Sequence, residues 1–246
     1  MRINKCKNIG RVIFVVEGDK DEVELLKNLF SKVFDYSIVN YDKRTNQIIE
    51  LKSKNNKYSR VFVIPAEYSS IKKFDIDDDY FDNIFRKLSK YELDSENSAI
   101  YILFDRDRDS NRPKAINDKM KLYVNSRDNG INKNGLLLMS YPCIQSFYYN
   151  CNKDNKDVLS SKELKEDFEC IKYQVKLDNL KEGLNYFFKK IKDILKEDFS
   201  LSFLDNFKDC NIKIFNYEEK EYEKYNRYIL LSMLFVSFVD LGIVEL

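Results

Sequence analysis

Short, uninterrupted apolar runs constrain the fold of this chain more than any other feature of its sequence. They span Arg11–Val16, Arg60–Ile64, Ser98–Phe104 and Gly135–Met139, and the first three are rich in β-branched and aromatic residues. A strand with apolar residues on both faces is typical of a parallel sheet that helices cover. An amphipathic helix follows the first run, and Pro113 begins another helix after the third. The pattern predicts an α/β fold with a mainly parallel sheet flanked by helices.

The rest of the sequence predicts further elements and a change of character near residue 150. Before that point we expect two short strands, Tyr36–Tyr41 and Gln47–Leu51, joined by a polar turn. We also expect a helix with acidic residues at its start, over Asp77–Tyr91. Beyond it the apolar spacing is helical, at Ser160–Phe168, Asn179–Leu195, Asp198–Phe215 and Glu218–Val239. We therefore predict an α/β core over residues 10–150 and an α-helical C-terminal region over residues 151–246 that packs on it.

Net charge and histidine content exclude several classes of nucleic-acid enzyme. The 246 residues contain 42 Lys and Arg against 41 Asp and Glu, which leaves a net charge of +1. A chain this close to neutrality does not coat a polyanion uniformly, so any nucleic-acid contact must come from a local patch. Because the sequence contains no His, histidine-dependent nucleases and hydrolases are excluded, as are nearly all catalytic zinc sites.

Cysteine usage and hydropathy predict a cytoplasmic protein without a membrane segment. The five cysteines form no CxxC pair, which is typical of reduced thiols that serve as small apolar residues. The start, Met1–Gly10, lacks the apolar segment of a signal peptide. The apolar run Tyr228–Leu246 contains two carboxylates and is too short to span a bilayer. We expect it to form a buried core helix.

Carboxylates follow two of the predicted strands directly. The first motif is Glu17-Gly18-Asp19-Lys20-Asp21, and the second is Asp105-Arg106-Asp107-Arg108-Asp109. In open α/β sheets, ligands bind outside the carboxyl ends of the strands. If the two strands are adjacent and parallel, several carboxylates converge there, and they repel one another unless a cation neutralises them. Oxygen ligands without His or Cys favour Mg²⁺ or Mn²⁺ over zinc.

Other families that use aspartate clusters fit the second motif less well. An EF-hand loop beginning at Asp105 would need Gly and Glu where the chain has Ser110 and Ile116. A phosphoryl-aspartate hydrolase would need Thr where the chain has Asp109. A nucleotide-sugar transferase with an Asp-x-Asp metal site remains open, but it leaves Glu17-Gly18 unexplained.

A strand followed by Glu17-Gly18 and a helix, and then a strand followed by Asp105-x-Asp107, resembles the Toprim domain of topoisomerases, primases and OLD-type nucleases. Among these, the chain looks closest to the small Toprim effector proteins of bacterial phage-defence, or abortive infection, systems. The segment Leu138–Gln145 is similar to a strand-end element of some of these proteins, which usually carry Glu where this chain has Gln145. The resemblance covers roughly residues 10–150 and implies a Toprim-like Rossmannoid core.

The resemblance also implies a metal-dependent nuclease, with catalytic roles for Glu17, Asp105 and Asp107. Asp105 and Asp107 would hold Mg²⁺ or Mn²⁺, with Asp109 as an accessory ligand. Glu17 would ligate a second metal or act as general base on the attacking water, and Asp21 or Glu22 would extend the site. The metal would polarise the phosphate and stabilise the in-line transition state.

Cations near these motifs are candidates for contacts with nucleic acid, either DNA or tRNA and other RNA. Beside the second motif they are Arg106, Arg108, Arg112 and Lys114, and in the basic loop Lys52–Arg60 they are Lys52 and Lys54. The alternative is that these side chains neutralise neighbouring carboxylates or simply face solvent. A second functional hypothesis is a non-catalytic or partner-activated Toprim subunit that docks on an ATPase or forms a homodimer through its C-terminal helices.

Overall fold

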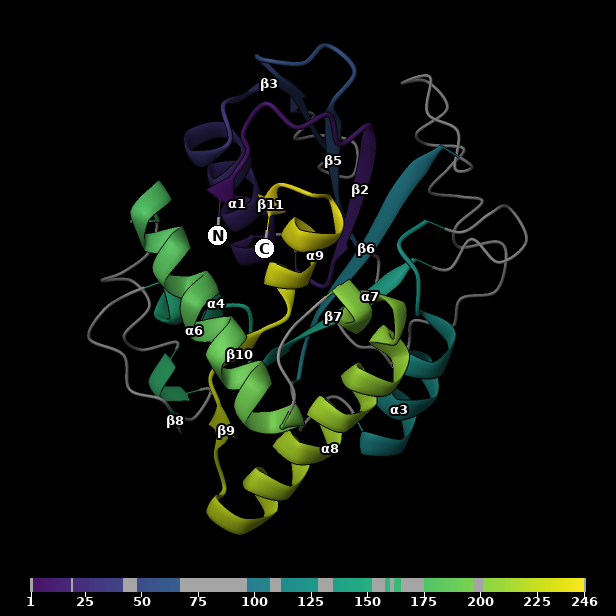
Figure 1. Ribbon diagram of the computed structural model, residues 1–246, viewed down its shortest axis with the longest axis vertical. Coiled ribbons are helices and arrows are strands. Elements are labelled where there is room, and N and C mark those ends of the chain that lie inside the picture. The colour runs from purple at the N-terminus through teal and green to yellow at the C-terminus, as the bar shows by residue number, and fades with distance from the viewer. Residues whose placement is uncertain are drawn as a thin grey trace. The chain divides into compact units, whose positions relative to one another are not determined.

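The computed structural model describes residues 2–18, 20–41, 48–66, 97–106, 112–127, 135–151, 158–159, 162–164, 175–196 and 201–245 (Figure 1). Contacts divide the chain into two compact units. Unit 1 contains Met1–Ile3, Phe104–Asp109 and Leu138–Leu246, and unit 2 contains Asn4–Leu103 and Ser110–Leu137. The division therefore assigns the second acidic motif to the same unit as the C-terminal region.

Unit 2 holds most of the central sheet and the helices that follow its strands. Its elements are β2 (Arg11–Val16), α1 (Asp21–Asn28), the π-helix η1 (Leu29–Val33), β3 (Tyr36–Tyr41), β4 (Ile49–Ser53), β5 (Arg60–Pro65), most of β6 (Ser98–Asp105), α3 (Pro113–Leu122) and the start of β7 (Leu136–Tyr141). The strands predicted from the apolar runs are confirmed within one or two residues. The helix expected at 77–91 and the turn at 43–46 lie outside the described residues.

The hydrogen-bonded strand order of the sheet is β10-β7-β6-β2-β5-β4-β3. β2 is parallel to both β5 and β6, whereas β4 is antiparallel to β3 and β5. The three parallel strands lie side by side in Figure 1. The fold is thus α/β with a mixed, mostly parallel sheet flanked by helices, as the fully apolar runs predict.

The core of unit 2 forms where α1 and η1 pack on the sheet. Val12 to Val16 are all buried, and so are the apolar residues of the helical segment that follows β2: Val23, Leu25, Leu26, Leu29, Phe30 and Phe34. The ring of Phe14 lies 5.8 Å from that of Phe30 and 5.2 Å from that of Tyr101, centroid to centroid. Burying such rings is the main term that stabilises this unit.

Unit 1 combines helices with short strands. Its further elements are β1 (Arg2–Ile3), α4 (Ser146–Asn150), β8 (Val158–Leu159), α6 (Leu177–Leu195), α7 (Leu201–Asp205), α8 (Phe207–Tyr225), β9 (Tyr228–Ile229), β10 (Leu231–Ser232), α9 (Leu234–Asp240) and β11 (Val244–Glu245). The helix predicted from residue 179 to 195 is confirmed as α6. Of the segment 160–168, only residues 162–164 are described, and they are helical.

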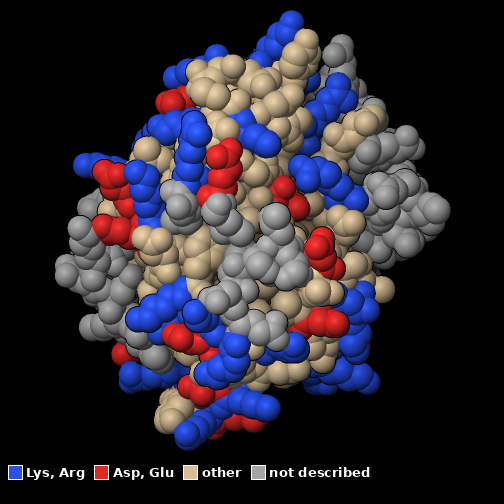
Figure 2. Space-filling model, viewed as in Figure 1, with Lys and Arg blue, Asp and Glu red and all other residues tan. Residues whose placement is uncertain are grey.

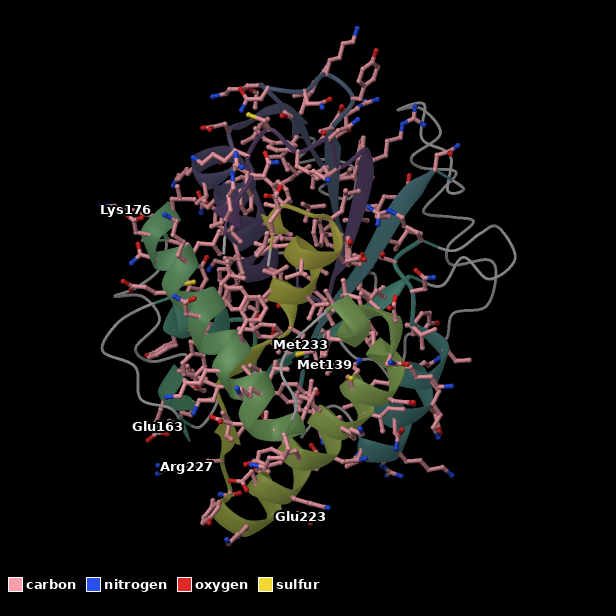
Figure 3. The ribbon with its side chains drawn as sticks, in the orientation of Figure 1. Met139, Glu163, Lys176, Glu223, Arg227 and Met233 are labelled. Carbon is pink, nitrogen blue, oxygen red and sulfur yellow. The ribbon has the colours of Figure 1, made fainter. Side chains whose placement is uncertain are left out.

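The predicted helix Glu218–Val239 is wrong. Helix α8 ends at Tyr225, because Asn226 adopts the left-handed conformation (φ 56°) that commonly terminates helices. The chain then forms β9 and β10, and β10 pairs antiparallel with β7. The backbone N–H of Met233 also donates to the carbonyl of Met139 (3.0 Å), and the two methionines are labelled side by side in Figure 3.

The side chain of Asn150 in α4 bonds to the backbone around β10. The amide of Asn150 donates to the carbonyl of Leu230 (2.9 Å) and accepts from the backbone N–H of Ser232 (3.3 Å). Leu230 to Val239 are buried, so the apolar run is part of the core, as expected, although much of it is not helical. Among the described helices, none has both the length and the hydropathy needed to cross a bilayer.

Candidate functional site

Glu17 lies at the carboxyl end of β2, immediately after the last residue of that strand. Its backbone N–H donates to the carbonyl of Leu103 in β6 (3.0 Å), and Val16 is the register partner of Leu103 in the parallel ladder. The strands that precede the two acidic motifs are therefore neighbours and run in the same direction. This arrangement is the one that the two-motif interpretation requires.

The turn after Glu17 contains a tightly packed glycine. A Cβ atom at Gly18 would overlap the carboxylate of Glu22, which is buried against the turn. Asp21 is the first residue of α1 and is partly exposed. Carboxylates in a first helical turn interact favourably with the helix dipole. Glu22 is thus the buried carboxylate of this motif, which helical spacing alone does not reveal.

Asp105 is the last residue of β6 and belongs to unit 1. Its Oδ1 accepts a hydrogen bond of 2.7 Å from the backbone N–H of Ile144, in the segment that follows β7. That segment begins with a cis peptide bond before Pro142, and the Ser146 hydroxyl ties it back to the carbonyl of Tyr141 (2.6 Å). A short hydrogen bond to a carboxylate is charge-assisted, so the orientation of Asp105 is set by residues from the end of β7.

Arg106 is fully buried, and the prediction that it contacts nucleic acid is wrong. Its Nε and Nη2 donate to the two carboxylate oxygens of Glu219 in α8, at 2.6 and 2.9 Å. Tyr228 also donates its hydroxyl to Glu219 (3.0 Å). A guanidinium held this way is unavailable to a phosphate, because exposing it would leave a buried carboxylate unpaired. The partner lies 113 residues away in sequence, so no local pattern identifies it.

Two further ionisable groups are buried in unit 1. Glu218 accepts from the backbone N–H of Ile229 through Oε2 (3.0 Å), while its Oε1 has no hydrogen-bond partner among the described residues. Desolvation raises the pKa of Glu218 well above its ordinary value of 4.5, and nearby Glu221 and Glu219 add to the shift. Desolvation, followed by the charge of Glu218, likewise raises the pKa of Tyr141.

The other predicted residues of the second motif are only partly described. Asp107, Arg108 and Asp109 lie outside the described residues. Within the described part of the chain, no three acidic, cysteine or histidine side chains are grouped so as to hold a metal ion. Arg112 and Lys114 are exposed at the start of α3 in unit 2.

The predicted phosphate contacts Lys52 and Lys54 are exposed, but they do not lie beside Glu17. Lys52 is the register partner of Arg60, and Arg60 is the register partner of Arg11 at the amino end of β2. Glu17 follows the other end of this strand, about 20 Å away at roughly 3.3 Å per residue. The basic loop and Glu17 thus lie at opposite ends of the strands in unit 2.

Gln145, which stands where the resembling proteins carry Glu, is buried at the start of α4. A neutral side chain at this position supplies amide atoms in place of a carboxylate.

Comparison with models of protein families, with curated proteins and with solved structures yields no match to this chain.

Proposed function

We propose that this chain is a metal-dependent nuclease of Toprim type that acts in bacterial anti-phage defence. The observation that carries the proposal is the parallel pairing of β2 with β6, because each of these strands is followed by or ends in a carboxylate. Glu17 comes directly after β2, and Asp105 ends β6. Ligands of open α/β sheets bind outside the carboxyl ends of the strands, which supports a shared role for the two motifs.

The chemistry of the donors fits a hard divalent cation. Asp105 and Asp107 would hold Mg²⁺ or Mn²⁺, which would polarise the scissile phosphate and stabilise charge on it. Asp105 contributes a carboxylate whose orientation is constrained by the hydrogen bond from Ile144. Glu17 would take the proton from the attacking water or serve as a further ligand, with Asp21 and Asp109 as accessory groups.

The buried pair of Arg106 and Glu219 would act as a positioning element for this chemistry. Arg106 follows Asp105 directly, and its backbone N–H donates to the carbonyl of Ser140 in β7 (2.9 Å). Its guanidinium is fixed by Glu219. A catalytic carboxylate must be held within about 0.5 Å of its productive position, and this buried pair restricts the backbone on the carboxyl side of Asp105.

Purified protein incubated with Mg²⁺ or Mn²⁺ and plasmid, single-stranded DNA or total tRNA tests the proposal. We expect metal-dependent cleavage that disappears in Glu17→Gln and in Asp105→Asn, while Asp205→Asn, an exposed position in α7, retains it. Retention of cleavage in both site variants would refute the assignment. Cleavage lost only in Asp105→Asn would instead favour an Asp-x-Asp enzyme in which Glu17 is dispensable.

A partner-activated subunit is the second candidate function. It is favoured by two large apolar residues of β3, at the end of the strand order, that are exposed to solvent, Ile38 by 45% and Val39 by 56%. Exposed edge strands commonly pair with other chains. Metal-induced thermal stabilisation that is lost in Asp105→Asn, without cleavage by the isolated chain, would support this function over an autonomous nuclease.

A further inference from the structure

The loop between β4 and β5 is built by its own polar side chains. The Ser53 hydroxyl accepts from the backbone N–H groups of Asn55 and Asn56, both at 3.2 Å. The Asn56 side chain accepts from the backbone N–H of Tyr58 (3.0 Å). The Ser59 N–H donates to the carbonyl of Asn56 (3.1 Å). These bonds satisfy the loop backbone locally, so the loop holds one conformation while its outward side chains remain available.

The N-terminal segment Asn4–Gly10 packs against this loop. The Ser59 hydroxyl accepts from the backbone N–H of Ile9 (3.1 Å) and lies 3.3 Å from the Asn8 side chain. The Arg60 N–H donates to the carbonyl of Gly10 (2.9 Å). Segments 4–10 and 52–60 thus form one surface at the amino edge of the strands of unit 2, and we call it the amino-edge surface.

This surface is strongly basic in a chain that is nearly neutral. Its two segments contain six Lys and Arg and no acidic residue, whereas the whole chain has a net charge of +1. Two of these cations are neutralised by neighbours, Arg60 by Glu50 (2.6 Å) and Lys5 by Asp35 (3.5 Å). The remaining four are exposed and form no ion pair with a described carboxylate: Lys7, Lys52, Lys54 and Lys57. In Figure 2, blue surface is more extensive than red at the end of unit 2 where Figure 1 labels β3.

An exposed aromatic ring lies among these lysines. Tyr58 is 65% exposed, the most exposed large apolar or aromatic side chain among the described residues. The ammonium of Lys57 lies 5.0 Å from the centroid of its ring. Lysines that neutralise phosphates and an open ring on which a base can stack are the two parts of a single-strand binding site.

We infer that the amino-edge surface binds single-stranded nucleic acid, with Tyr58 stacking on a base and Lys52, Lys54 and Lys57 contacting phosphates. A single strand fits better than a duplex, because a duplex does not expose base faces to a protruding ring. The inference relies on the proposed function for its class of ligand only. Binding here involves no carboxylate and needs no divalent metal, so it is a separate site from Glu17 at the opposite edge of the unit 2 sheet.

Helix α8 supplies a matched control. Lys224 lies over the ring of Tyr225 at 4.7 Å, and Tyr225 is 55% exposed, so the local geometry repeats that of Lys57 and Tyr58. The surroundings differ in charge, because Glu221 and Glu223 flank this second pair. Figure 3 labels Glu223 at this end of α8. Arg227 lies near the same ring, but the two carboxylates offset the cations, so phosphates should bind more weakly here than at the amino-edge surface, which contains no acidic residue.

The test is fluorescence anisotropy with a labelled oligothymidylate or oligouridylate of about twelve nucleotides, in EDTA at low salt. We expect the wild-type chain to bind and Tyr58→Ala to lose roughly tenfold in affinity. Lys54→Ala/Lys57→Ala should weaken binding and reduce the slope of log K against log salt by about 1.4. Tyr225→Ala and the exposed α8 pair Lys213→Ala/Lys220→Ala should bind as the wild type does.

The same assay separates this inference from the proposed nuclease. Wild-type protein that binds the oligonucleotide in EDTA but cleaves no nucleic acid when Mg²⁺ or Mn²⁺ is supplied would sustain the surface while removing the nuclease. Equal losses in the α8 control variants, or an unchanged affinity in Tyr58→Ala, would overturn the inference. So would tighter binding to phosphatidylserine vesicles than to the oligonucleotide, because the surface would then be a membrane contact. The substituted tyrosine and lysine side chains are all exposed, so matching thermal unfolding should verify the fold of each of these variants.

Discussion

Glu17 follows one buried apolar strand and Asp105 ends another, but the contacts described beside them differ. The backbone of Glu17 bonds to the neighbouring strand, and the turn after it packs locally, since a Cβ atom at Gly18 would overlap the carboxylate of Glu22 only four residues later. At the Asp105 end the contacts are distant in sequence, with Ile144 donating to Asp105 and Glu219 binding Arg106. Two motifs that look alike in sequence thus differ in how the fold supports them, and substitutions should separate them.

The largest expected effect is at the buried ion pair beside Asp105. Glu219→Ala should destabilise the protein by about 3–5 kcal/mol, because it leaves the fully buried Arg106 guanidinium without its counter-charge. Urea unfolding measures this change. Glu50→Ala is the matched control in unit 2, since its partner Arg60 is partly exposed and can be hydrated, and we expect a smaller loss. Arg106→Met/Glu219→Leu should recover much of the stability, and a double variant as unstable as Glu219→Ala would contradict this reason.

The second prediction compares the stability cost of removing Asp105 with that of removing Glu17. Asp105→Ala should cost about 1.5–3 kcal/mol, because the N–H of the buried Ile144 loses its acceptor. Glu17→Ala should cost less than about 1 kcal/mol, since the Glu17 side chain is partly exposed. Chemical denaturation of both variants checks the difference. Asp105→Asn keeps an acceptor oxygen, so its stability cost should lie between those of Asp105→Ala and Glu17→Ala. Equal costs for Asp105→Ala and Glu17→Ala would mean that the fold supports the two strand ends alike.

The dependence of stability on pH should report on Glu218. Burial raises its folded-state pKa well above 4.5. Below pH 4.5 the carboxyl is protonated in both states, and above that pH the unfolded chain releases a proton that the folded chain keeps. Stability from this group should therefore fall as pH rises from 4.5 to the folded pKa, by up to about 1.4 kcal/mol per pH unit.

The variant Glu218→Gln should lack that decline. Free energies of unfolding measured from pH 4 upward should give a difference between wild type and variant that changes with pH in this window. Asp205→Asn, which alters an exposed carboxylate, is the control. Parallel pH profiles for the wild type and Glu218→Gln would mean that Glu218 is ionised in the folded protein.

A further small effect is expected at the Glu17 turn. Gly18→Ala should cost about 1 kcal/mol, because the added methyl group displaces the Glu22 carboxylate, the flexible end of a side chain. In a double-mutant cycle, Glu22→Ala should remove most of this cost. Additive costs in the cycle would show that Gly18 is required for a reason other than its contact with Glu22.

Much of the sheet was predictable because its signals are local. The run Val12–Val16 is apolar at every position, and only a strand covered on both faces buries all of it. The placement of Glu17 after β2 and of Asp105 at the end of β6 follows from the same runs. Whether Asp107 and Asp109 complete the site is a prediction that lies outside the described residues.

The errors arose where a distant partner decided the outcome. Arg106 sits between two aspartates in sequence, which favours a solvent-facing cation, yet its partner is Glu219 on α8. The segment Tyr228–Ser232 is apolar enough for a buried helix, but it forms β9 and β10 because Asn226 ends α8 and β7 offers a strand edge.

The sequence by itself determined the α/β class, the apolar strands and the acidic residues that follow two of them. It did so because these features depend on the hydropathy and conformational preference of neighbouring residues. Only the tertiary structure decided that Arg106 is buried, that β10 joins the sheet and that the basic loop lies at the edge opposite Glu17. These outcomes depend on contacts between residues that are far apart in the chain, and a buried charge or an open strand edge is stable only when the fold supplies its partner.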